Sequence, residues 1–294
     1  ADRYPLLFKP VYKDYAWGGS SIQKRFNRSH VPGTCAESWE LCDRPEGMSV
    51  VSNGHLAGNT LRDVAATSGS ALFGVLPVPD RFPLLVKILD AKEALSVQVH
   101  PQAGPQLLPG VEPKSEMWYV LDAAPGACVF AGLVPGTTRA GFLRLLEKGE
   151  IESALRRVEV RAGDTVYVPG GRVHAVGSGC LLLEVQQNSN TTYRVFDWNR
   201  GRTDGKPRPL HRKEALETIA WDDFEDPRPA TSVLPSSSSN RREQLVRTDV
   251  FDVQRISLAG AETEIGNGTA CDILFVAEGV ARVADLHLAG ERRE

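Results

Sequence analysis

Short apolar runs with the composition of β-strands dominate this chain. Glycine and proline separate the runs, as expected where strands are joined by tight turns. Several short strands at close spacing are typical of an all-β barrel or sandwich. We therefore predict a mostly β protein built around a barrel. The predicted strands are 49–51, 84–89, 95–99, 118–121, 128–131, 165–168 and 181–185.

A few segments have helical spacing instead. Residues 60–65 predict a short helix that Thr60 or Asn59 caps. Between residues 138 and 157 the apolar side chains recur close to every third or fourth position, and Gly149 is expected to divide this segment into two short helices. Residues 216–219 are a further helical candidate. The segment near 138–157 is thus predicted to be a helical insertion in the β framework.

The composition changes after residue 226. Residues 227–240 are rich in proline and serine and offer too little apolar surface to become ordered on their own. Beyond them, residues 251–258 alternate like a strand with one solvated face. We predict a main domain at 1–226, a linker or loop at 227–240, and a smaller β unit at 241–294.

Two histidines, a glutamate and a glutamine have the spacing of a metal site. In an extended strand Gln98 and His100 project to the same side, and Glu116 opens the next predicted strand. His174 follows a Pro-Gly-Gly turn. A lone histidine is usually structural, but these four side chains together suit a divalent transition metal such as zinc, with positions left for water or substrate. Gln98 alone would otherwise be interpreted as a hydrogen-bonding residue of the barrel wall.

Two lysines lie where a free charge is costly. Lys87 interrupts the apolar run at 84–89, so it must meet a charge or a cavity, unless it faces water from an edge strand. Lys114 precedes Glu116 by two residues and is expected to share its face. Either cation could hold a phosphate group. We interpret Glu37 and Glu40, on either side of Trp39, as structural partners of the barrel.

Several motifs resemble those of known protein families. The Gly-Asp-x4-Pro-Gly-Gly-x2-His segment resembles the second signature of the cupin barrels, a fold that hosts many functions. With the other motifs, in their order along the chain, it is similar to the short bacterial form of type I mannose-6-phosphate isomerase. The resemblance runs from about residue 5 to about residue 220. The motifs that carry it are at 36–40, 82–91, 96–101, 113–119, 163–174 and 191–200.

The resemblance implies a cupin barrel with helical insertions and a second, reduced cupin-like β unit that a hairpin at 272–283 opens. It also implies the metal-dependent, reversible isomerisation of mannose 6-phosphate and fructose 6-phosphate through a cis-enediol. Lys87, Lys114 and Arg194 would then be catalytic and substrate-binding residues, beside a zinc site of one ion per chain. The base that takes the C2 proton stays open between metal-bound hydroxide and a lysine of lowered pKa.

Two alternatives are a metal-dependent cupin oxygenase and a non-catalytic sugar-binding cupin. The oxygenase would prefer iron held by two histidines and a carboxylate, and would not need Lys114 or Arg194. Loss of catalysis is made plausible by the expected reduction of the second unit. Turnover of a phosphorylated hexose separates both alternatives from the isomerase.

Composition limits the kinds of partner that the chain is expected to bind. The 34 basic and 37 acidic residues give a net charge of −3, which does not favour nucleic acid or another polyanion. No apolar run is long enough to cross a bilayer, and we expect no leader at the amino end. The five cysteines include no CxxC pair, as expected of free thiols in a reducing cytoplasm. The oligomeric state is left open.

Overall fold

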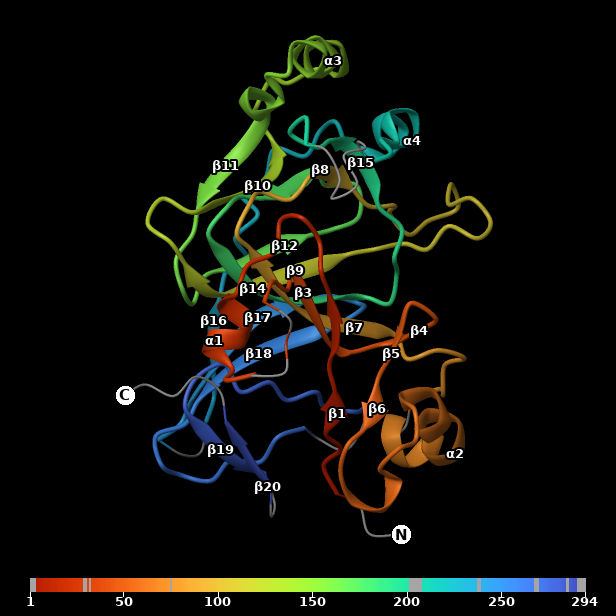
Figure 1. Cartoon of the computed structure of the whole chain (residues 1–294), viewed down its shortest axis with the longest axis vertical. Helices are drawn as coiled ribbons and strands as arrows, with labels where there is room; N and C mark the ends of the chain where they lie inside the picture. Colours follow the sequence, from red (N-terminus) through yellow and green to blue (C-terminus); the bar gives the residue numbers. More distant parts are fainter. Residues whose placement is uncertain are drawn as a thin grey trace.

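The computed structural model describes residues 4–28, 31, 33–74, 76–200, 208–236, 239–266, 270–283 and 286–289. Two antiparallel sheets face each other in its centre (Figure 1). The larger sheet consists, in spatial order, of β12 (Thr165–Val168), β9 (Glu116–Ala123), β14 (Cys180–Gln187), β7 (Leu84–Ala91), β3 (Glu37–Leu41) and β2 (Val11–Lys13). The smaller one consists of β11 (Leu155–Glu159), β10 (Cys128–Leu133), β13 (His174–Val176), β8 (Val97–Val99) and β15 (Tyr193–Phe196).

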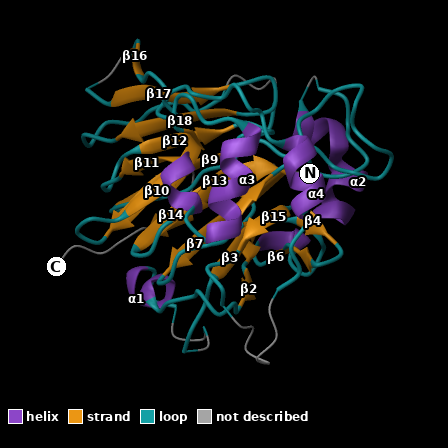
Figure 2. Cartoon of the chain, turned by 90° about the horizontal axis from the view of Figure 1, so that it is seen from above, coloured by secondary structure: helices purple, strands orange, loops and turns teal. Residues whose placement is uncertain are grey.

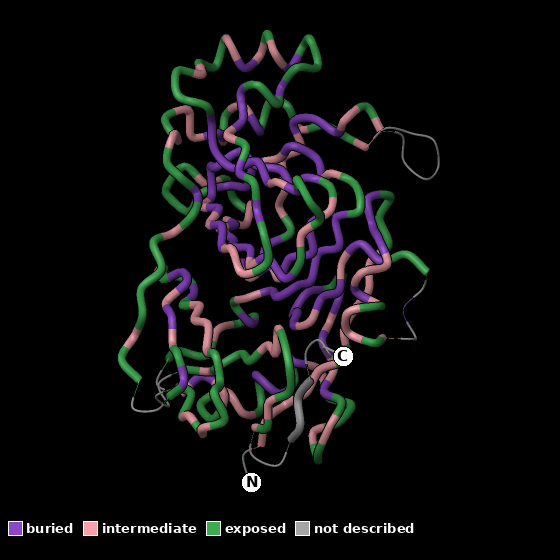
Figure 3. Tube along the Cα trace, turned by 90° about the vertical axis from the view of Figure 1, so that its left-hand side faces the viewer, coloured by how far each residue is buried: buried purple, intermediate pink, exposed green. Residues whose placement is uncertain are grey.

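The core of the barrel lies between the inner faces of these sheets. Trp118, Leu182 and Leu89 from the larger sheet belong to one buried cluster with Val129 and Val176 from the smaller sheet. Buried chain is correspondingly concentrated in the central strands (Figure 3). Burial of large apolar side chains from both sheets is the main stabilising contribution of such an arrangement. The predicted mostly β, cupin-type barrel is confirmed.

The helices lie outside the barrel and differ in part from the prediction. Thr60 caps a longer helix than expected, and its side chain and that of Asp63 form a reciprocal capping box. Gly149 ends α3 with φ of 75°, which glycine adopts without strain. The helices are α1 (Ser21–Arg25), η1 (Gly54–Leu56), α2 (Leu61–Phe73), α3 (Arg139–Lys148), η2 (Ile151–Ala154) and α4 (Arg212–Thr218).

The second half of the expected 138–157 insertion is not an α-helix. After the single 3₁₀ turn η2 the chain enters strand β11, where Leu155 pairs with Leu133 of β10. Residues Leu155 and Val158 are buried while their polar neighbours are more exposed, a pattern that a strand on the edge of the barrel satisfies. Pairing with β10 supplies backbone hydrogen bonds that local helical spacing does not reveal.

An outer sheet covers the back of the larger barrel sheet. It consists of β16 (Ser232–Leu234), β17 (Arg241–Arg247) and β18 (Asp252–Ser257), and Figure 2 shows β17 and β18 alongside β12 and β9. Val246 and Phe251 pack against Met117 on the outer face of β9. Part of the predicted linker is therefore the strand β16. The division at 226 and 240 stays a prediction.

The remaining strands form small pairs at the periphery. Residues 272–277, expected in a hairpin, contain no strand; instead Phe275 packs against Phe26 next to α1. The hairpin begins later, at β19. The peripheral pairs are β1 (Phe8–Lys9) with β6 (Val50–Val51), β4 (Asp43–Arg44) with β5 (Gly47–Met48), and β19 (Val280–Val283) with β20 (Leu286–Ala289).

Candidate metal centre

Three neighbouring barrel elements bring the predicted ligands together. His174 is the first residue of β13 and lies directly opposite Gln98 of β8, which His100 follows by two residues. Glu116 is the first residue of β9 in the facing sheet. One ligand atom each of His100, Glu116 and His174 lies within 4.8 Å of the others, and each residue is only 1% exposed. The barrel interior therefore holds a compact, buried His–Glu–His cluster.

Both histidines are oriented by backbone carbonyls. Nδ1 of His100 lies 3.0 Å from the Thr191 carbonyl oxygen, and Nδ1 of His174 lies 2.8 Å from that of Arg172. Because a carbonyl oxygen only accepts, each Nδ1 must carry the hydrogen and each Nε2 keeps its lone pair. Both Nε2 atoms lie 3.4 Å from the carboxylate of Glu116. Two lone pairs and an anion that converge in this way fit a divalent cation.

The protonation states also suit metal binding. Burial lowers the pKa of His100 to about 4, assisted by the Lys114 ammonium group, and burial lowers that of His174 as well. Burial alone would raise the pKa of Glu116, but Lys114 and the two histidines outweigh it and hold that pKa well below its usual range. At neutral pH the cluster thus contains two neutral imidazoles and one carboxylate, the forms that ligate metals.

Gln98 lies beside the cluster at partial exposure. Its Nε2 is 3.3 Å from His174 Nε2, and its Oε1 accepts a hydrogen bond from Ser96 Oγ at 3.2 Å. The nitrogen and the oxygen of an amide occupy equivalent positions, so a half-turn of the amide would present Oε1 to the cluster instead. Its place among the ligands stays a prediction.

Lys114 lies inside the cluster. Its Nζ is 2.6 Å from Glu116 Oε2 and 3.1 Å from His100 Nε2, and the residue is only 5% exposed. It therefore supplies positive charge directly to two of the predicted ligands. Lys114 is therefore buried, whereas a lysine that binds a phosphate from solvent would be exposed.

Lys87 is buried in the middle of the larger sheet, which excludes an edge position facing water. Its Nζ lies 3.2 Å from Glu184 of β14 and 3.7 Å from Glu37 of β3. Burial lowers the pKa of Lys87, but Glu37 and Glu184 outweigh it, so the pKa is raised above its usual range. Lys87 therefore stays charged, and it does not have the lowered pKa that a lysine base requires.

Arg194 reaches the cluster through a hydrogen-bonded relay. It lies opposite Gln98 on β15, and its Nε donates to Ser96 Oγ at 3.2 Å, the hydroxyl that in turn donates to Gln98. Its Nη1 donates to the Pro209 carbonyl oxygen at 2.9 Å. The structure thus gathers all seven predicted site residues around one part of the barrel, while their roles stay predictions.

Two further carboxylates belong to this interior. Glu184 is 4% exposed and accepts a hydrogen bond from Trp118 Nε1 at 3.2 Å; sequence reasoning missed it, although it interrupts the run Leu-Leu-Leu-Glu-Val. Glu37, expected to be only structural, approaches Lys87 and accepts from Trp39 Nε1 at 2.6 Å. A charged residue inside an apolar strand is the signal that could have identified Glu184.

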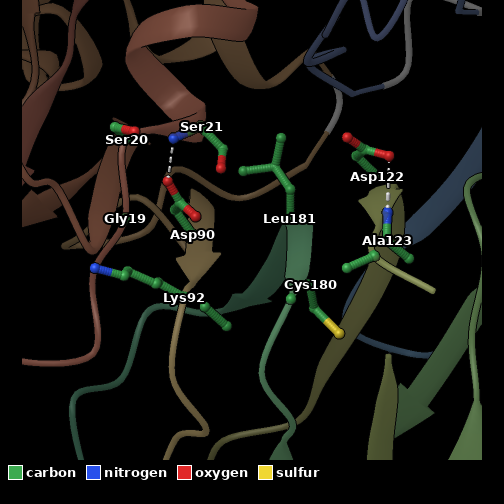
Figure 4. Close-up of a pocket in the computed structure, with 12 residues that line it drawn as sticks. Gly19, Ser20, Ser21, Asp90, Lys92, Asp122, Ala123, Cys180 and Leu181 are labelled. Carbon is green, nitrogen blue, oxygen red and sulfur yellow. Dashed lines mark hydrogen bonds between the residues drawn. The ribbon is translucent and has the colours of Figure 1, made fainter. Parts of the chain in front are cut away.

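A separate hollow of about 420 Å³ lies at the end of β9 opposite to Glu116 (Figure 4). Asp90 and Cys180 contribute to its lining, and Asp90 accepts a hydrogen bond from the backbone of Ser21 at the start of α1. Its described lining contains none of the seven predicted site residues. The convergent buried polar groups, rather than this hollow, therefore locate the candidate site.

A barrel of this kind defines a cupin, and the buried His–Glu–His cluster inside it fits a metal ion. The catalytic domain of type I phosphomannose isomerase matches residues 6–131. The mannose-6-phosphate isomerase ManA of Bacillus subtilis is 43% identical over 217 residues, which are 73% of this chain and 68% of that protein. The chain belongs to the type I phosphomannose isomerase family.

Solved structures agree with this assignment. The mannose 6-phosphate isomerase structure from Bacillus subtilis has a TM-score of 0.80 and 33% identity, and the match covers 88% of this chain and 81% of that one. A mannose 6-phosphate isomerase solved with zinc and yttrium has a TM-score of 0.71, covering 97% and 93% of the two chains. At 19% identity the latter supports the fold alone. Among the described residues, no helix has the length and apolar character needed to cross a membrane.

Proposed function

We propose that this chain interconverts mannose 6-phosphate and fructose 6-phosphate, and that His100, Glu116, His174 and Gln98 hold one zinc ion for this reaction. The observation that carries the proposal is the convergence of two imidazole lone pairs and one carboxylate inside the barrel of a member of this family. Bound zinc would orient the sugar oxygens and stabilise negative charge that develops between C1 and C2.

The three cationic side chains have different roles in the proposed site. Lys114 holds positive charge against the ligand set, and Lys87 is a buried positive charge between Glu37 and Glu184. Arg194 is partly exposed and offers a planar donor group that stabilises an oxyanion or binds the phosphate. Preorganised charges in a buried site act more strongly than in water because little solvent screens them.

The oxygenase alternative shares the two histidines and the carboxylate. It is not favoured, because the chain belongs to an isomerase family and because Lys114 is built directly into the cluster. A non-catalytic sugar-binding protein is likewise not favoured, since the interior contains the buried charges of Lys87, Lys114, Glu116 and Glu184. We also place the enzyme in the cytoplasm, where its phosphorylated substrate would be made and where its free cysteines would stay reduced.

A coupled assay with mannose 6-phosphate tests the proposal. Purified protein should turn over this substrate, lose most activity after treatment with a strong chelator, and regain it when zinc is added back. Elemental analysis should give about one zinc ion per chain. Activity indifferent to chelation, in protein free of transition metal, would contradict the zinc assignment, and absence of turnover by metal-loaded protein would contradict the isomerase.

A further inference from the structure

The orientation of His174 depends on its near neighbour Arg172. The Arg172 carbonyl oxygen accepts the hydrogen of His174 Nδ1 at 2.8 Å, which aims Nε2 at Glu116. This carbonyl belongs to the Pro-Gly-Gly turn, where Gly171 has φ of 88°. The backbone on either side of this carbonyl is held by two hydrogen bonds, from Arg172 N to the Pro169 carbonyl oxygen at 3.1 Å and from Gly132 N to the Val173 carbonyl oxygen at 2.9 Å.

The side chain of Arg172 adds three further contacts that restrain the turn. Its Nε and Nη2 donate to the two carboxylate oxygens of Asp223, each at 2.7 Å, and its Nη1 donates to the Tyr167 carbonyl oxygen at 2.9 Å. The side chains of Arg172 and Asp223 are only 5% and 11% exposed. A planar guanidinium group held at three points in this way fixes the backbone that carries it.

Asp223 is itself anchored to the barrel. Its backbone carbonyl accepts from Leu133 at the end of β10, at 3.0 Å, and Ala220 just before it donates to the Gly171 carbonyl at 2.9 Å. The segment that follows α4 thus closes over the turn that leads into β13. It is far from the metal ligands in sequence, yet it is joined through one arginine to the carbonyl that orients one of them.

We propose that Arg172 and Asp223 form a positioning pair that sets the direction of His174 Nε2 and thereby the affinity of the metal centre. The inference rests on the proposed metal centre, and neither residue touches metal or substrate in it. Groups that orient a ligating histidine typically change metal affinity by about 10- to 100-fold when they are replaced. The pair also explains a buried charge at Arg172 that the isomerase reaction itself does not use.

The test measures metal binding and does not depend on activity. Asp223→Asn keeps the shape of the side chain but loses its charge and one of the two hydrogen bonds that it accepts from Arg172. Its zinc affinity, measured by chelator competition, should fall about 10- to 100-fold. The visible spectrum of the cobalt(II)-loaded variant should change, because it reports ligand geometry. Arg172→Lys keeps the charge but cannot donate two parallel hydrogen bonds to Asp223, so its zinc affinity should also fall. This variant replaces Asp223→Asn in the test if Asp223→Asn does not fold.

Glu40→Gln is the matched control. Glu40 accepts a similar fork from Arg28, at 2.8 and 2.9 Å, on the other face of the larger sheet. This variant should lose stability but keep the zinc affinity and cobalt spectrum of the wild type. Unchanged affinity and spectrum in Asp223→Asn, or an equal loss in Glu40→Gln, would overturn the positioning role. Absence of metal binding by the wild type would instead overturn the proposed function, and the positioning role with it.

Discussion

The barrel interior and the outer sheet both contain ion pairs, and the pair of Arg247 with Asp252 in the outer sheet is far more exposed than the pair of Lys87 with Glu184 in the interior. The side chains of Lys87 and Glu184 are 8% and 5% exposed, whereas those of Arg247 and Asp252 in the outer sheet are 72% and 36% exposed. Burying charges carries a large desolvation cost, which exposed pairs avoid. Several buried charges that converge in the interior are therefore the signature of a functional site, while the Arg247–Asp252 pair lies on a solvated surface.

Strand β9 shows how the two regions meet, although the outer sheet also packs against Tyr167 of β12 and Val185 of β14. On β9, Glu116 faces the barrel interior, while Met117, one residue later, faces the apolar contact with Val246 and Phe251. The outer sheet thus supports the strand that carries a predicted ligand without contributing a charge to the site. The comparison predicts that interior substitutions alter metal and turnover, and that outer ones alter only stability.

The largest effect is expected at the histidines. His100→Ala should remove most bound zinc and lower turnover by about two to three orders of magnitude, because the ligand set loses one of its lone pairs. The fold should survive, since apolar packing between the sheets holds the barrel. Elemental analysis and circular dichroism of the same sample check both parts. A variant with full metal content would remove His100 from the ligand set.

Arg194→Ala should retain zinc but lose about 10²- to 10³-fold in kcat, as expected when one donor to a developing oxyanion is removed. The permanently charged guanidinium group cannot act as a base, but its interaction strengthens as negative charge develops. Steady-state kinetics separate the possibilities. Near-normal kcat with a strongly raised KM would make Arg194 a phosphate binder, and unchanged parameters would place it outside the site.

Lys114→Met should lower kcat/KM by about ten- to more than a hundredfold, the loss typical of a charge-assisted contact worth about 1.5–3 kcal/mol. The apolar replacement has a similar length, so packing is conserved while the ammonium group beside Glu116 and His100 is lost. Zinc content should change less than turnover. Kinetics identical to those of the wild type would show that Lys114 is not used in the reaction.

Metal-free protein should become less stable in mild acid. The folded-state pKa of His100 is about 4 against an ordinary value of 6.5, so the unfolded chain binds more protons between these values. The contribution of neutral His100 to the free energy of unfolding is complete above pH 6.5 and is lost as the pH falls towards 4. The total loss is about 3 kcal/mol. Urea unfolding of chelator-treated protein at several pH values measures this loss, and His100→Gln should reduce it. An equal pH dependence in His100→Gln would assign the effect to other groups.

The smallest effect is expected in the outer sheet. Asp252→Asn breaks the exposed pair with Arg247 and should cost no more than about 1 kcal/mol of unfolding free energy, with unchanged zinc content and kinetics. Thermal unfolding and the coupled assay measure both. A clear fall in turnover would show that the outer sheet influences the site, which would contradict the division drawn between the two regions.

Much of the barrel was predictable because its strands are encoded locally. The run at 165–168 coincides with β12, and the ligand candidates stood out because motif spacing places them at the starts or ends of strands. Two of the errors have a common cause. Residues 155–157 and 232–234 became strands because β10 and β17 offer them pairing partners, which local periodicity does not report.

Residue types and spacings by themselves determined that the chain is mostly β, that two histidines and a glutamate are candidate ligands, and that a buried Lys87 requires an opposite charge. Only the tertiary structure decided that this partner is Glu184, that Gln98 lies opposite His174, and that Arg172 is held by Asp223. Alternation along a strand specifies which side chains face the core. Strand order and register decide which distant side chains meet there, and burial by both sheets then sets their charge states.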